Sequence, residues 1–262
     1  MSKRYYIRNQ LMPCEEDFTH EFKGHRNICV ENLPPWTQAN EKQDRASRRA
    51  VSRTLNAFLN TGKGGTAYLG VIDNGQVKGL TLSVYQKAHV LGSVYDLMAR
   101  YRPPVKSHRY QVRFIPVFDS HSEAQAILEN MVPEVLETDL QDRAHSFRTH
   151  DYCWCDKDNA IKYNAGILQP DYVIEISVLP WLTSDPRNVG DGCGSFTNLH
   201  PIHEDEEGNC FFRRQASLVQ YTMTELAQLT RHEVKEQCLQ TIKQLKEEIA
   251  ELEARKANKI PD

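Results

Sequence analysis

Three acidic residues in the first eighty positions have the types and spacing of a divalent-metal site. Glu16 and Glu21 lie five residues apart, and Asp73 follows the apolar run at 69–72. Hard cations such as Mg²⁺ and Mn²⁺ bind one or two carboxylates together with waters and substrate phosphate. Carboxylates gathered beside a basic surface would therefore hold a metal ion over a phosphodiester for cleavage.

Lys23 is a further catalytic candidate. On a strand, residues two apart face the same side, so Glu21 and Lys23 would project together as a metal ligand and a cation for the scissile phosphate. If cleavage used the 2′-hydroxyl of RNA instead, a general base such as His20 or His25 would be required. Each acid also has a plainer interpretation, since Asp73 in Asp-Asn-Gly is what a hairpin turn demands.

Basic residues are concentrated in the first part of the chain. Residues 1–113 carry 18 Lys and Arg against 9 Asp and Glu, whereas the remainder carries 14 against 26. This asymmetry favours a polyanion-binding half, although solvated faces without a partner are the alternative. The predicted phosphate contacts, which have few acids near them in sequence, are Arg45, Arg48, Arg49, Arg53, Lys63, Lys78, Arg100 and Arg102.

A second group that could do chemistry is His150 with Cys153 and Cys155. Zinc is one interpretation, with a fourth ligand from Cys193, His200, His203 or Cys210. Buried thiols without metal are the favoured alternative, because the two cysteines are separated by a single residue. Seven cysteines in 262 residues indicate reduced thiols rather than a disulfide framework. The start of the sequence lacks the apolar block of a signal peptide, so the expected location is intracellular, in the cytoplasm rather than the nucleus.

The elements that must position these residues indicate an α+β fold with a mixed β-sheet and flanking helices. Helices are predicted over 42–60 and 83–100, and strands at 21–23, 66–72, 77–80, 110–118, 171–179 and 210–214. Residues 119–169 are acidic and weakly periodic, which predicts an insertion containing one short helix over 123–140.

The C-terminal residues predict a coiled-coil-like helix. Apolar residues recur at spacings of 4, 3, 4 and 3 from Cys238 to Leu252. A helix that docks on its own domain is the alternative to a dimer. The expected organisation is a domain over 1–230 and this helix over 231–262, with no membrane span.

The motif set of the N-terminal half resembles the Schlafen core domain of AlbA type. It consists of Glu16 spaced five residues from Glu21-Phe22-Lys23, then 56–61, Gly64-Gly65, 69–71, Asp73 and 77–79. Later landmarks at 103–105, 211–214, Ser217 and 224–226 fit the same pattern, so the resemblance covers about residues 14–230.

The resemblance implies a divalent-metal-dependent endoribonuclease that cuts structured RNA such as tRNA or small-RNA precursors, with Glu16, Glu21 and Asp73 as its carboxylates. It also implies a structural zinc site of one His and three Cys. Schlafens carry two lobes that form a basic groove, so this one-lobe chain would need a homo- or hetero-oligomeric partner of the same kind.

Two other functions fit the same residues. The chain would act as a catalytically silent RNA-binding or scaffolding subunit if the carboxylates lie too far apart. An ATP-binding module is disfavoured, since the glycine-rich segment 60–66 follows a helix and precedes a strand, the reverse of a phosphate-binding loop.

Overall fold

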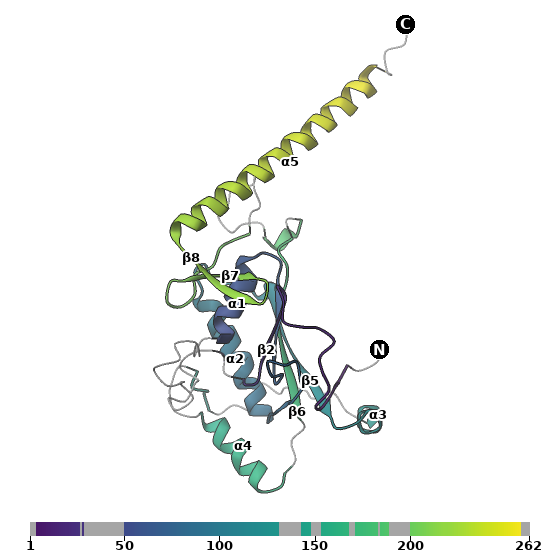
Figure 1. Ribbon diagram of the computed structural model, residues 1–262, viewed down its shortest axis with the longest axis vertical. Coiled ribbons are helices and arrows are strands. Elements are labelled where there is room, and N and C mark those ends of the chain that lie inside the picture. Colours follow the sequence, from purple (N-terminus) through teal and green to yellow (C-terminus); the bar gives the residue numbers. More distant parts are fainter. Residues whose placement is uncertain are drawn as a thin grey trace. The chain divides into compact units, whose positions relative to one another are not determined.

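The computed structural model describes residues 4–26, 28, 50–130, 143–147, 153–167, 171–182, 184–188 and 200–257, and it confirms an α+β fold with a mixed sheet (Figure 1). The helices are α1 (Ala50–Asn60), α2 (Val84–Arg100), α3 (His121–Asn130), α4 (Trp154–Asn164) and α5 (Met223–Ala257). The strands are β1 (Tyr6–Ile7), β2 (His20–Lys23), β3 (Gly65–Leu69), β4 (Leu80–Thr81), β5 (Tyr110–Phe118), β6 (Asp171–Val178), β7 (Cys210–Arg214) and β8 (Ser217–Tyr221).

Six strands form the main sheet in the order β1-β5-β6-β3-β2, with β4 also paired to β6. Strand β6 is central and runs antiparallel to β3, β4 and β5, whereas β2 and β3 are parallel. The last strand at one edge of the sheet, as far as the chain is described, is β2. Because parallel strands end at the same edge, the residues after β2 and β3 come close together.

The two faces of the sheet are buried in separate cores, and β6 contributes to both. Tyr172, Ile174 and Ile176 alternate into the core shared with α1 and α2, and Val173 points into the opposite one. This alternation follows from the two-residue period of a strand. Helix α2 begins with a capping box between Ser83 and Gln86, as a serine three residues before glutamine predicts.

Strands β7 and β8 form a separate hairpin, which α1 holds through two buried asparagines. The Asn60 side chain accepts a hydrogen bond from the His203 N–H and donates to the carbonyls of His203 and Phe211. Asn56 accepts from the Phe211 N–H and donates to the His203 carbonyl. Since buried amides cost free energy unless they are bonded, this network fixes where β7 lies.

The region predicted to be an insertion contains two helices in its described part, α3 and α4, where one was expected. Helix α3 packs Ala124 against Ile7 and Phe118. Helix α4 contacts α2 and buries Cys155. The expectation that this region stands apart from the core is therefore wrong for α4, whose amphipathic signal is weak because few of its residues are apolar.

The chain divides into two compact units, one of residues 1–181 with 202–220 and the other of residues 182–201 with 221–262. The second unit contains α5, which runs from Met223 to Ala257 as one helix of 35 residues. The structure shows the helix but no coiled coil. Within the described residues, no helix combines the length and apolar character needed to cross a membrane.

Candidate active site and metal centre

Strand β2 presents Glu21 and Lys23 on one face, as its two-residue period predicts. Phe22 points the other way and packs edge to face on Tyr68. Glu21 is buried, and its Oε1 lies 2.5 Å from the Lys23 Nζ. The same Nζ also donates to the Phe22 carbonyl at 2.8 Å, so the lysine is held next to the carboxylate.

Arg213 of β7 provides the second cation for Glu21. Its side chain is fully buried, and its Nη1 lies 2.5 Å from the Glu21 Oε2. The remaining donors bond to the backbone carbonyls of Asp17 and His20. Both oxygens of Glu21 are therefore paired with cations, and the asparagine network on α1 brings the arginine there. The sequence placed Arg213 in the landmark at 211–214 but gave no sign of its contact with Glu21, which is 192 residues away.

Glu16 lies at the edge of the sheet, where its Oε1 accepts a hydrogen bond from the Phe22 N–H at 2.8 Å. This N–H points away from β3, since alternate backbone groups of an edge strand have no ladder partner. Burial raises the pKa of Glu16, and the charges of Glu21 and Asp73 raise it further, although the Phe22 N–H and Lys23 act in the opposite direction. Glu16 is thus close enough to Glu21 and to Asp73 to be repelled by both.

Asp73 is exposed at the tip of a hairpin, as predicted, with an antiparallel bridge between Val71 and Val77 below it. His25 lies within the influence of the same charges. Burial lowers the pKa of His25, Lys23 lowers it further, and Asp73 opposes them. A neutral imidazole at neutral pH is the form that a general base requires. His20 instead bonds Asp17 at 2.9 Å and stacks on Tyr68.

The three carboxylates are near neighbours but do not form a ready-made chelate. In the part of the chain that the structure describes, only one group brings three or more potential ligand atoms within mutual reach, and it consists of His and Cys residues. The carboxylates offer the oxygen donors that Mg²⁺ and Mn²⁺ prefer. A cation bound there would also relieve the repulsion that Glu16 experiences.

The predicted phosphate contacts have mixed surroundings. Lys63, Lys78 and Arg102 are exposed, with Lys63 over the Phe18 ring and Lys78 bonded to Asn9. The expectation of few acidic neighbours is wrong for two of the arginines, because Arg53 lies 3.6 Å from Glu207 and Arg100 lies 3.0 Å from Asp96 and 3.6 Å from Glu206. The candidates Arg45, Arg48 and Arg49 lie outside the described residues.

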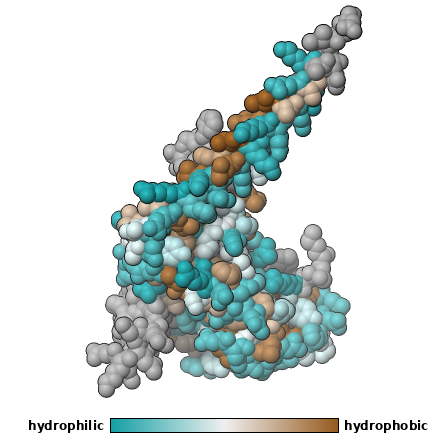
Figure 2. Space-filling model, turned by 45° about the horizontal axis from the view of Figure 1, so that its top comes forward, coloured by the Kyte–Doolittle hydropathy of each residue, from teal (hydrophilic) through white to brown (hydrophobic). Residues whose placement is uncertain are grey.

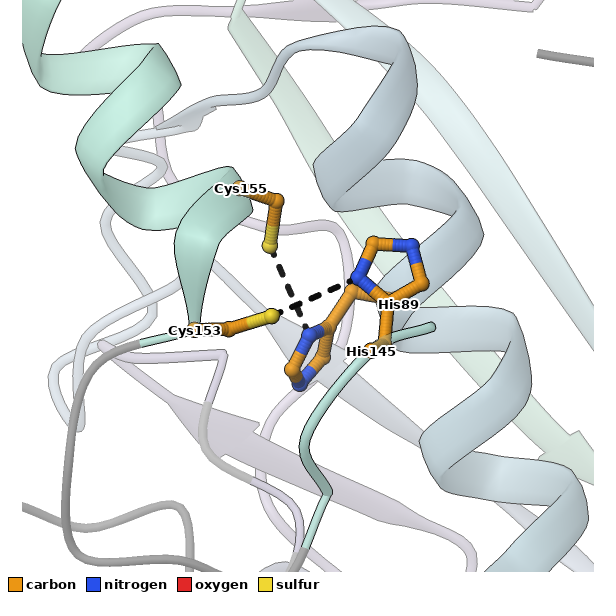
Figure 3. A group of neighbouring side chains, drawn as sticks. All are labelled: His89, His145, Cys153 and Cys155. Atoms are coloured by element: carbon orange, nitrogen blue, oxygen red, sulfur yellow. Dashed lines mark hydrogen bonds between the residues drawn. The ribbon is translucent and has the colours of Figure 1, made fainter. Parts of the chain in front are cut away.

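The group that does converge is His89, His145, Cys153 and Cys155, whose ligand atoms all lie within 4.8 Å of one another (Figure 3). His89 comes from α2, the two cysteines from the start of α4, and His145 from the segment 143–147. The Cys153 Sγ is 3.5 Å from the His145 Nδ1, and the Cys155 Sγ is 3.5 Å from the His89 Nδ1.

Asp156 fixes the start of α4 next to this cluster. Its carboxylate accepts a hydrogen bond from the Cys153 N–H at 3.1 Å and from the Gln86 side chain at 3.0 Å, and it forms an ion pair with Arg26. Both cysteines are therefore held against α2 by polar contacts that do not use the thiols themselves.

The distances in the cluster match a tetrahedral zinc site. With Zn–S of about 2.3 Å and Zn–N of about 2.0–2.1 Å, neighbouring S and N ligands are about 3.5 Å apart. Burial lowers the pKa of His89 to about 3, helped by Arg26 and His145, and keeps this imidazole neutral as a ligand must be. Burial and Cys153 raise the pKa of the Cys155 thiol to about 12, a cost that a bound cation would remove.

Two of the three predicted zinc candidates, Cys153 and Cys155, belong to this cluster, and His150 lies outside the described residues. Of the proposed fourth ligands, His200, His203 and Cys210 are not members of the cluster, and His203 instead bonds the Pro103 carbonyl at 2.6 Å. Cys193 lies outside the described residues. His89 was missed because it is a lone histidine in an amphipathic helix. Its burial among polar positions of α2 is visible only in the fold.

The glycine-rich segment that suggested ATP has a structural explanation. A Cβ at Gly64 would lie 2.4 Å from the Val178 carbonyl, and a Cβ at Gly65 would lie 2.5 Å from the Phe58 ring. These glycines are needed for the close approach of α1 and β3 to β6.

In a comparison with models of known protein families, no family model matches the chain. The resemblance to Schlafen domains thus depends on the motif residues given above.

Proposed function

We propose that the protein is a divalent-metal-dependent endoribonuclease of the Schlafen type that cuts structured or small RNA, such as tRNA or small-RNA precursors. The observation that carries this proposal is that Glu16, at the edge strand β2, lies close enough to Glu21 and Asp73 for both charges to raise its pKa, with the Lys23 Nζ 2.5 Å from Glu21. An acid repelled by two others next to a fixed cation suits a site that binds a metal and a phosphate.

Each residue has a role that its surroundings suggest. Glu16, Glu21 and Asp73 would hold Mg²⁺ or Mn²⁺, which neutralises charge on the phosphate oxygens when bound. Lys23 orients Glu21 and faces the phosphate. Arg213 holds the Glu21 carboxylate in place, so it is a positioning residue. Neutral His25 is placed to take a proton from the attacking hydroxyl.

The experiment is a cleavage assay with purified protein and end-labelled tRNA, small-RNA precursor and single-stranded DNA. We expect cleavage of RNA with Mg²⁺ or Mn²⁺, and its loss in Asp73→Asn, which changes an exposed tip without disturbing the core. Glu15→Gln is the matched control, because Glu15 is an exposed neighbour outside the acidic trio. Chelated samples should be restored with Mg²⁺ and with Zn²⁺ separately, since a chelator removes both metals.

A second candidate function is a catalytically silent RNA-binding subunit. The pairing of both Glu21 oxygens with Lys23 and Arg213 favours it, because a satisfied carboxylate has less to gain from a metal. Tight RNA binding without cleavage, unchanged by Asp73→Asn, would support this alternative. Cleavage that persists in that variant without any metal would contradict the endoribonuclease mechanism.

We also propose that His89, His145, Cys153 and Cys155 bind a structural zinc ion. Elemental analysis should find about one zinc per chain, and Cys155→Ser should lose it and unfold at a lower temperature. Cys210→Ser is the control, since Cys210 is also buried but lies outside the cluster. A full zinc content in Cys155→Ser would contradict the assignment.

A further inference from the structure

The second half of α5 presents an unpaired apolar stripe. Every residue from 242 to 256 is exposed, so this part of the helix has water on all sides. Brown side chains nevertheless run along the helix in Figure 2. The stripe consists of Cys238, Ile242, Leu245, Ile249 and Leu252, and the four aliphatic members are 49–62% exposed.

Such a stripe is not ordinary surface. Single exposed apolar residues are common, but a contiguous row marks a contact surface. Helices of about 15 residues are also marginal in water without packing. The 4-3-4-3 spacing is the seam of a left-handed coiled coil, and the covering element is therefore another helix.

The residue types at the a and d positions of the stripe indicate which kind of helix pairs with it. Ile242 and Ile249 occupy the a positions of the heptad, and Cys238, Leu245 and Leu252 occupy the d positions. Isoleucine at a with leucine at d favours two parallel strands. A second copy of the chain supplies the same order, so that isoleucine meets isoleucine and leucine meets leucine only when the two helices are parallel and in register.

We propose that α5 pairs with α5 of a second copy as a parallel, in-register, two-stranded coiled coil over residues 238–252. This arrangement places Cys238 of one copy opposite Cys238 of the other. It also places Val234 (position g) against Leu239 (position e) of the other helix, which widens the apolar seam at its start.

The charged residues at the e and g positions make the dimer weak. Substitutions at these positions should therefore change its affinity. In a parallel dimer each g residue faces the e residue five positions later on the other helix. Thr241 then faces Lys246 without conflict, whereas Glu248 faces Glu253 with like charges. Two heptads with two repulsive contacts predict association in the micromolar range.

The first test is the mass of the purified full-length chain by light scattering across micromolar concentrations. We expect a reversible dimer that Ile249→Asp abolishes and Ala250→Asp, on the outer side of the helix, does not. Both variants should keep the circular dichroism and melting of the remaining fold. A monomer at all concentrations, or a dimer indifferent to Ile249→Asp, would overturn the proposal.

Two further variants test orientation and partner. Mild oxidation should link the dimer through Cys238, with no link in Cys238→Ser, which should still dimerise. Glu248→Lys converts two repulsive contacts into attractive ones and should tighten the dimer about tenfold, whereas Glu236→Lys, outside the seam, should not. A dimer that does not cross-link, or that Glu248→Lys weakens, would show an antiparallel or different arrangement and refute the parallel one.

Discussion

Replacing Arg213 by methionine tests the link between the β7 hairpin and the candidate active site. Arg213 is fully buried and donates to Glu21 and to the carbonyls of Asp17 and His20. Methionine fills similar space but removes these buried hydrogen bonds and the charge next to Glu21. Removing one partner of a buried ion pair costs about 3–5 kcal/mol. We expect the lower end of that range, because Lys23 still compensates one oxygen of Glu21.

The assay is thermal unfolding followed by circular dichroism, with Arg214→Met as the matched control. Arg214 is the next residue of the same strand and is exposed. At about 3 kcal/mol, the melting temperature of Arg213→Met should fall by roughly 6–12 °C for a domain of this size. In a double-mutant cycle, Glu21→Gln should cost much less in the Arg213→Met background than alone. Equal stability of the two methionine variants would refute the reasoning.

Three further predictions follow from local geometry. In the metal-free protein, alkylation followed by mass spectrometry should modify exposed Cys238 quickly and Cys155, whose burial raises its pKa to about 12, slowly. Gly64→Ala should destabilise the fold in thermal melts by more than Gly208→Ala, since both have positive φ but only the first meets backbone within 3 Å. The lowered pKa of His25 means that folding favours its neutral form, so wild type should lose stability relative to His25→Gln as pH falls below about 6.5.

The sequence predicted those elements whose apolar pattern is strong and local. Helix α2 with its Ser83 cap, and strands β5, β6 and β7, lie within a residue or two of their expected bounds. The turn with Asp73 at its tip is also present and is closed by the Val71–Val77 bridge, but the return strand expected over 77–80 is not, because β4 begins at Leu80 and pairs with β6. In each case the neighbouring residues alone supply the turn, cap or periodicity, so no distant contact was needed.

The sequence could not predict contacts between side chains that are far apart in the chain. Arg213 reaches Glu21 only because Asn56 and Asn60 fix β7, and neither asparagine is unusual in its own helix. The acid that pairs with Arg53, and one of the two that pair with Arg100, come from the turn at 204–207, so counting acids near in sequence was misleading for these contacts. His89 was missed for the same reason, since it is 66 residues from its cluster neighbour Cys155.

The hydrogen bond from the Phe22 N–H to Glu16 gives this acid a second task besides any chemistry. It blocks a free peptide group on the border strand, the kind of group to which a strand of another molecule can attach. An alanine at position 16 would thus leave the Phe22 N–H of β2 without its acceptor. Strands of other molecules could then pair with this edge, and self-association alone would lower activity. Glutamine keeps an acceptor for the Phe22 N–H but removes the negative charge. Glu16→Gln therefore distinguishes a catalytic role of Glu16 from its role in covering the sheet edge.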